Sequence, residues 1–228
     1  MALYRDGLLR GHAVLVAPAL DARACAVAAL FASLGASVAV CAPLADAAAA
    51  ALPPSLPADR ALVHVGDPRR PEAAQAAVAA AWDRFGALDT LVCATAREAA
   101  PRAALDTPDD DWREAVGAEL DAAWFLMHAA AQRWRDADRA GSVVALVHPF
   151  RQAGAGDSLA AATGASIVHL ARTVAVEWAA HRVRVNCVAP SGASDRQVAE
   201  AAVWLAAPSG KFVTGETMWL ARPPGSAG

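Results

Sequence analysis

Short, unbroken runs of apolar residues recur along the chain and alternate with stretches whose apolar residues repeat every three to four positions. Unbroken runs are typical of parallel strands buried on both faces, and the longer period is typical of helices. The pattern predicts seven strands, at residues 13–16, 37–41, 61–65, 90–93, 142–147, 184–188 and 216–220.

Helical patterns fill the intervals between these runs. Glycine is expected to end two of the helices, at Gly35 and Gly86. Alternating strands and helices of this kind predict one α/β domain over residues 1–228, with a doubly wound, Rossmann-like parallel sheet of seven strands. The predicted helices cover residues 27–34, 71–85, 109–134, 158–180 and 198–206.

Composition and charge narrow the class of protein. The net charge of −3 over 228 residues does not indicate a protein that binds nucleic acid. Four separated cysteines without a CxxC pair indicate buried thiols in a reducing compartment, and the histidines lack metal-ligand spacing, so no metal is predicted. The charged N-terminus predicts no signal peptide, and no apolar run looked long enough to span a membrane, so a cytoplasmic protein is expected.

Four stretches of the chain, in the same order, resemble the short-chain dehydrogenase/reductase superfamily. They match its helix and fourth strand, its fifth strand, its helix-strand-Pro-Gly segment and its last strand. The resemblance covers nearly the whole chain and implies the Rossmann-like fold. The stretches read WDRFGALDTLVCATA, GSVVALVH, LARTVAVEWAAHRVRVNCVAPSG and FVTGETMWL.

The turn after the first strand lacks the glycines by which that superfamily binds a dinucleotide. Glycine lets backbone N–H groups approach the pyrophosphate, but Pro18, Ala22 and Ala24 stand at these positions. Proline has no N–H, and Asp21 adds a negative charge. Ala42 stands where the family recognises the ribose, and His64 replaces the aspartate that usually follows the third strand. The chain is therefore expected to bind no cofactor.

The superfamily's catalytic residues are also replaced. The resemblance places His148 at the serine, Ala160 at the tyrosine, Gly164 at the lysine and Glu119 at the asparagine. The substrate lid that usually follows the Pro-Ser-Gly segment is deleted, because a helical pattern begins almost at once. Without a lid, a site excludes water poorly.

These replacements predict a catalytically inactive subunit that stabilises an active NAD(P)-dependent paralogue in a heterotetramer, with NAD(P) in the partner. A β-hydroxyacyl-CoA dehydrogenase of anaerobic aromatic degradation is one context in which the superfamily has such pairs. Apolar residues on both sides of the two long helices indicate a subunit interface. The predicted interface residues are Trp112, Trp124, Phe125, Met127, Ile167, Val168, Val174, Trp178, Val213, Met218 and Trp219.

Two alternatives remain open. His148 and Glu119 could act as an acid–base pair in an enzyme without a nicotinamide cofactor. Against this, we expect His148 to be solvated or bonded to backbone, and Glu119 to be solvated or paired with Arg113 or Arg23. The second alternative is a small-ligand sensor that meets an anion with Arg23 and Arg97.

Overall fold

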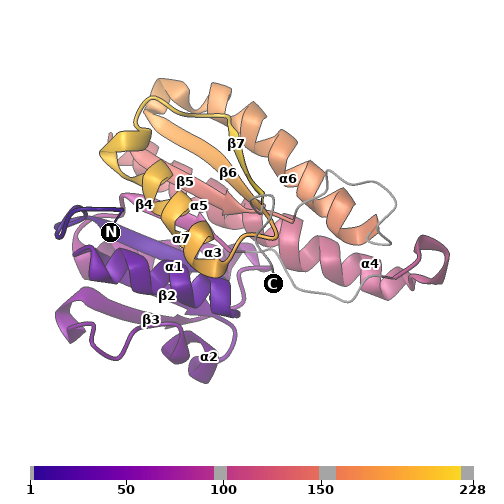
Figure 1. Ribbon diagram of the computed structural model, residues 1–228, viewed down its shortest axis with the longest axis horizontal. Coiled ribbons are helices and arrows are strands. Elements are labelled where there is room, and N and C mark those ends of the chain that lie inside the picture. Colours follow the sequence, from indigo (N-terminus) through magenta and orange to yellow (C-terminus); the bar gives the residue numbers. More distant parts are fainter. Residues whose placement is uncertain (1–2, 95–101, 149–157, 222–228) are drawn as a thin grey trace.

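The computed structural model describes residues 3–94, 102–148 and 158–221. Within them, seven parallel strands form one sheet in the order β3-β2-β1-β4-β5-β6-β7 (Figure 1). This confirms the predicted fold class, including the reversal of strand order between β1 and β4. The strands are β1 Ala13–Ala17, β2 Ser37–Ala42, β3 Ala61–Val65, β4 Thr90–Cys93, β5 Gly141–Leu146, β6 Val183–Ser191 and β7 Thr217–Ala221.

Helices cover both faces of the sheet. The helices α1 and α7 pack on one face, and α3, α5 and α6 pack on the other. The helices are α1 Ala22–Ser33, α2 Ala45–Ala50, α3 Pro71–Phe85, α4 Asp109–Ala115, α5 Ala122–Asp136, α6 Ser158–Glu177 and α7 Asp195–Ala206, with short 3₁₀ turns at Ala58–Arg60, Ala104–Asp106, Ala179–His181 and Pro208–Gly210.

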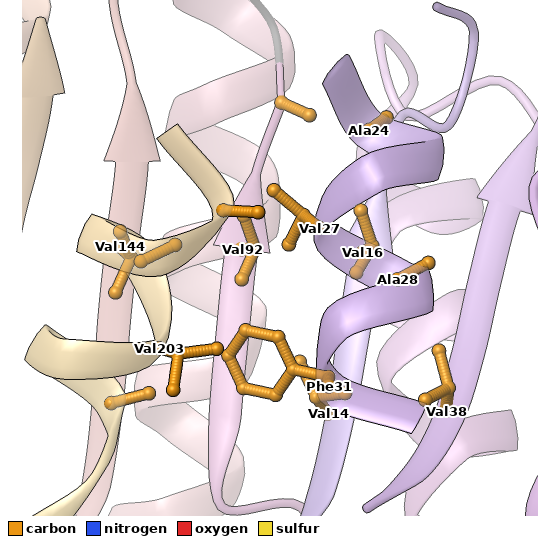
Figure 2. Close-up of a cluster of buried hydrophobic side chains, with 14 of the residues drawn as sticks. Val14, Val16, Ala24, Val27, Ala28, Phe31, Val38, Val92, Val144 and Val203 are labelled. Atoms are coloured by element: carbon orange, nitrogen blue, oxygen red, sulfur yellow. The ribbon is translucent and has the colours of Figure 1, made fainter. Parts of the chain in front are cut away.

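The core under α1 and α7 is built around the ring of Phe31. Figure 2 shows this ring on α1 pointing toward Val203 of α7, next to Val92 of β4. All three side chains are fully buried. The apolar positions of two helices and the central strands therefore meet in one cluster, which holds the first residues of α1 at the edge of the sheet.

The helices begin and end at residues that commonly cap helices. Gly86 ends α3 with a φ of 75°, a left-handed conformation that favours glycine. At α7, Ser194 and Gln197 form a capping box. Because α7 begins at Asp195, only Gly192, Ala193 and Ser194 separate it from β6. A long insertion at this point is absent, as the sequence predicted.

The long helix predicted over residues 109–134 differs from expectation. A π-helix, Val116–Asp121, separates α4 from α5. A π turn adds about one residue to a helical turn, and such turns are frequent at functional sites. It rotates the side chains of α4 relative to those of α5, and Glu119 lies within it.

Part of the predicted subunit interface needs correction. Met127, Ile167 and Val174, predicted at a subunit interface, are core residues of this chain, with exposures of 0%, 1% and 3%. Trp112 is 46% exposed, and the other predicted interface residues are partly buried. The interface they would form stays a prediction.

In the described part of the chain, one helix, α6, is long and apolar enough to cross a membrane by length and composition. No such segment was expected from the sequence. Its buried residues, Ile167, Ala171 and Val174 among them, pack against the sheet as in the core helix of a globular domain.

Candidate active site

The candidate site lies at the carboxyl ends of the parallel strands. In open α/β sheets, ligands bind at this edge near the point where strand order reverses, and here that point lies between β1 and β4. The end of β1 leads into α1, and the end of β5 leads to His148. His148 therefore lies at this edge of the sheet.

His148 and Glu119 lie together in this region. His148 follows β5 closely, and Glu119 projects from the π-helix between α4 and α5. His148 Nε2 is 3.4 Å from Glu119 Oε1, and the two side chains are 14% and 6% exposed. Burial strengthens their interaction, because little solvent screens the two groups.

A third side chain, Thr163 of α6, completes the arrangement. Its hydroxyl donates a hydrogen bond of 2.6 Å to Glu119 Oε2. Thr163 is 2% exposed, so this contact also lies inside the molecule. Both carboxylate oxygens of Glu119 therefore have partners, one in the imidazole of His148 and one in the hydroxyl of Thr163.

These contacts correct the expectation of solvated side chains. Glu119 is buried and contacts His148. Arg113 pairs instead with Asp110, and Arg23 pairs with Asp195. Thr163 was missed, although it is a polar residue inside a largely apolar helical stretch. Ala160 and Gly164, also on α6, are buried and supply no titratable group.

The imidazole and the carboxylate correspond in their roles to the histidine and the aspartate of a catalytic triad. Because Nε2 faces the carboxylate, the imidazole proton is assigned to Nε2, and Nδ1 keeps a lone pair. A buried carboxylate of this kind orients the ring and stabilises the imidazolium that forms when the ring takes a second proton. The pair can therefore perform general acid–base chemistry.

The fold class implies a dinucleotide at the N-terminus of α1, and the residues at this helix end determine whether its pyrophosphate fits there. Asp21 caps the helix, and its Oδ1 accepts a hydrogen bond of 2.8 Å from the N–H of Ala24. The N–H of Ala19 donates to the carbonyl oxygen of Cys41 at 2.8 Å. Pro18 has no N–H to donate. A carboxylate thus stands where the pyrophosphate would bind, and the residues of this turn do not fit that group.

The end of β3 carries one acidic residue, Asp67, and the assignment of His64 to the family's aspartate position stays a prediction. His64 lies inside β3, and the aspartate that follows this strand is Asp67. Asp67 pairs with Arg69 at 2.7 Å, and the hydrogen bond from Arg69 holds the pKa of Asp67 below its usual range. Arg69 also reaches Glu114 of α4 at 3.0 Å. At the end of β2, Ala42 is buried and offers no polar side chain.

No buried cysteine is suited to act as a nucleophile in the described part of the chain. Burial raises the pKa of Cys41 and of Cys187 to about 12, and it also raises the pKa of Cys93. A thiol must lose its proton to react. Among the same residues, no group of three or more His, Cys, Asp or Glu is placed to hold a metal ion. Arg97, considered as an anion ligand, lies outside the described residues.

Comparison with known proteins identifies the family. The family model described as enoyl-(acyl carrier protein) reductase matches residues 22–196, more than half of the chain. The chain therefore belongs to the short-chain dehydrogenase/reductase superfamily.

Individual relatives agree with this assignment. A probable 2,4-dienoyl-CoA reductase of Bacillus subtilis is 32% identical over 126 residues, which are 54% of this chain and 49% of the relative. The chain thus spans about half the length of that curated relative. A short-chain dehydrogenase from Mycobacterium smegmatis has the same fold, with a TM-score of 0.87, 24% identity and 97% coverage of both chains.

A 3-ketoacyl-(acyl-carrier-protein) reductase from Brucella melitensis, solved in complex with NADH, also has a TM-score of 0.87, at 19% identity, covering 93% of this chain and 98% of that one.

The interpretation of the chain as a catalytically inactive subunit is wrong. The family model and the Bacillus relative are named as reductases. Replacement of the superfamily's usual residues was taken as loss of chemistry. The structure shows instead that two replacements, His148 and Glu119, meet in a buried pair. Assembly with an active paralogue in a heterotetramer stays a prediction.

Proposed function

We propose that this chain is an enzyme that transfers protons on a carbonyl compound, with His148 as the proton carrier. The observation that carries the proposal is the buried contact between His148 and Glu119, at the sheet edge where α/β proteins bind ligands. Glu119 is a positioning residue that orients the imidazole, and Thr163 holds Glu119 through its second oxygen.

The proposed step moves one proton and needs no other reactant. His148 Nδ1 takes a proton from the carbon next to the carbonyl group, and the electron pair of the broken C–H bond moves toward the carbonyl oxygen. The ring becomes an imidazolium whose charge Glu119 balances. The imidazolium exchanges its proton with water, and a proton then returns from the ring to a carbon of the substrate, so the reaction is an isomerisation or an exchange with solvent.

The names of the relatives support a carbonyl substrate. The family is described as an enoyl reductase, and the Brucella neighbour is named as a 3-ketoacyl reductase. Such substrates carry an acidic C–H beside a carbonyl group. An imidazole is a suitable base for such a proton, because its ordinary pKa lies near neutrality.

The experiment is deuterium incorporation from heavy water into a panel of ketones, enones and 3-ketoacyl thioesters, followed by mass spectrometry. The wild-type chain is expected to label at least one of them, and His148→Gln is expected to lose this activity. Glu119→Gln should retain a reduced rate, because the neutral amide no longer stabilises the imidazolium. Rates should be measured across pH, since loss of the carboxylate should move the pH profile as well as the maximum.

A matched control is His169→Gln, which changes an exposed histidine on α6. It should leave labelling unchanged. Equal labelling by the wild-type chain and His148→Gln would refute the proposal, and so would the absence of labelling across the whole panel. Oxidation of NADH or NADPH by the chain with one of these compounds would instead identify a dinucleotide-dependent reductase.

A further inference from the structure

The residues at the N-terminus of α1 differ from the glycine-rich turn by which the superfamily binds a dinucleotide. The positive end of a helix dipole attracts an anion, and its first N–H groups donate hydrogen bonds to it. In this chain the anion is supplied by the protein, because the Asp21 carboxylate caps the helix at 2.8 Å from the N–H of Ala24.

We infer that Asp21 replaces the pyrophosphate at this helix end and excludes NAD(P) from it. The inference goes beyond the proposed function, because it identifies the group that sets which ligands this edge admits. A pyrophosphate would have to displace the carboxylate from the Ala24 N–H or approach it closely. Displacement removes the helix cap, and approach brings like charges together in a partly buried place.

The neighbouring helix supports the same inference. Arg23 of α1 is 15% exposed, and its Nε lies 3.4 Å from Oδ1 of Asp195 in the first turn of α7. The Arg23 guanidinium, in the first turn of α1, is thus already paired with a carboxylate. Two acidic side chains, Asp21 and Asp195, therefore share this region with one arginine.

The packing of α1 against α7 fixes this pairing. Phe31 and Val203 are fully buried between the two helices and the sheet, as Figure 2 shows. The capping box at Ser194 sets the first turn of α7, and so the position of Asp195. A ligand that binds beside α1 is therefore expected to place no phosphate group at this helix end.

The experiment measures binding of NADH, and separately of inorganic pyrophosphate, by calorimetry and by NADH fluorescence. The variant is Asp21→Ser, because serine caps helices well and removes only the charge. The matched control is Asp46→Ser, which removes an acidic residue from the first turn of α2, a different helix. Thermal unfolding of all three proteins checks that each is folded.

The wild-type chain and Asp46→Ser are expected to show no saturable binding of NADH and equally weak binding of pyrophosphate. Asp21→Ser is expected to bind pyrophosphate about tenfold more tightly than the wild-type chain. Saturable binding of NADH by the wild-type chain would overturn the inference. A folded Asp21→Ser that gains nothing, or a gain of equal size in Asp46→Ser, would overturn the assignment to Asp21. Binding is measured without turnover, so these results are independent of the labelling experiment on His148.

Discussion

Replacing Thr163 by valine removes one hydroxyl group from the core while nearly preserving the shape of the side chain. The wild-type hydroxyl donates to Glu119 Oε2 at 2.6 Å, and Glu119 is 5% exposed. Water therefore has little access to the oxygen that loses its partner. A hydrogen bond to a charged group contributes about 1.5–3 kcal/mol to stability, and we expect Thr163→Val to lower the free energy of unfolding by that amount.

The measurement is urea unfolding at neutral pH, followed by circular dichroism, together with the thermal midpoint. A loss of that size corresponds to a fall of roughly 5 °C in Tm for a chain of this length. The control is Thr173→Val on the same helix, whose exposed hydroxyl donates only to the carbonyl oxygen of His169 at 3.0 Å. Thr163 makes the equivalent backbone contact with Leu159, so the control accounts for that contribution.

Thr163→Ser keeps the hydroxyl group and should recover most of the lost stability. If Thr163→Val and Thr173→Val change the free energy of unfolding equally, the hydrogen bond to Glu119 contributes nothing. The account of Glu119 as a carboxylate held at both oxygens would then be refuted.

Three other predictions concern the fold and its buried groups. Phe31→Ala should lower the free energy of unfolding by about 3–5 kcal/mol, as urea titration would show, because its ring fills the fully buried space under α1 and α7; a loss below about 1 kcal/mol would contradict that packing. Burial lowers the pKa of His12, whose Nε2 lies 2.9 Å from the hydroxyl of Thr90. As pH falls, the unfolded chain therefore takes up a proton at this histidine before the folded chain does. The contribution of His12 to the free energy of unfolding should be complete above the ordinary pKa of 6.5 and decline as pH falls below it. His12→Gln should flatten this part of the stability profile, and an unchanged slope would contradict the prediction. Among the four thiols, Cys25 alone is partly exposed, so Ellman's reagent should modify the native chain at that residue before any other; equal reaction in Cys25→Ser would show that another thiol is accessible.

The sheet could be predicted from the sequence because its strands are buried on both faces. Such strands appear as unbroken apolar runs, and β4, with all four residues buried, was predicted with its bounds. Gly86 likewise marked the end of α3, because a left-handed residue favours glycine. In these places a single local property of the sequence determines the structure.

The site required knowledge that no local pattern contains. The π-helix at Val116–Asp121 runs without interruption between α4 and α5, so the sequence predicts one continuous helix there. The contact of Thr163 with Glu119 joins residues 44 positions apart.

Replacement of a family's usual residues was also an unreliable guide to lost chemistry. The sequence already offered His148 and Glu119 as an acid–base pair, but the preferred expectation was an ordinary structural explanation for each residue. Their contact becomes visible only when the end of β5 and the π-helix are placed in space. Two substitutions that meet in a buried pair constitute a chemical site, whereas either one alone does not.

The most direct test of the acid–base pair is the protonation pattern of the His148 imidazole, because it needs no knowledge of the substrate. Long-range proton–nitrogen NMR spectra of chain labelled with ¹⁵N distinguish the two neutral tautomers, and His148→Gln assigns the signals. The account predicts a proton on Nε2 and a lone pair on Nδ1, with a clear change of the signals in Glu119→Gln. A proton on Nδ1, or signals unaffected by Glu119→Gln, would contradict it.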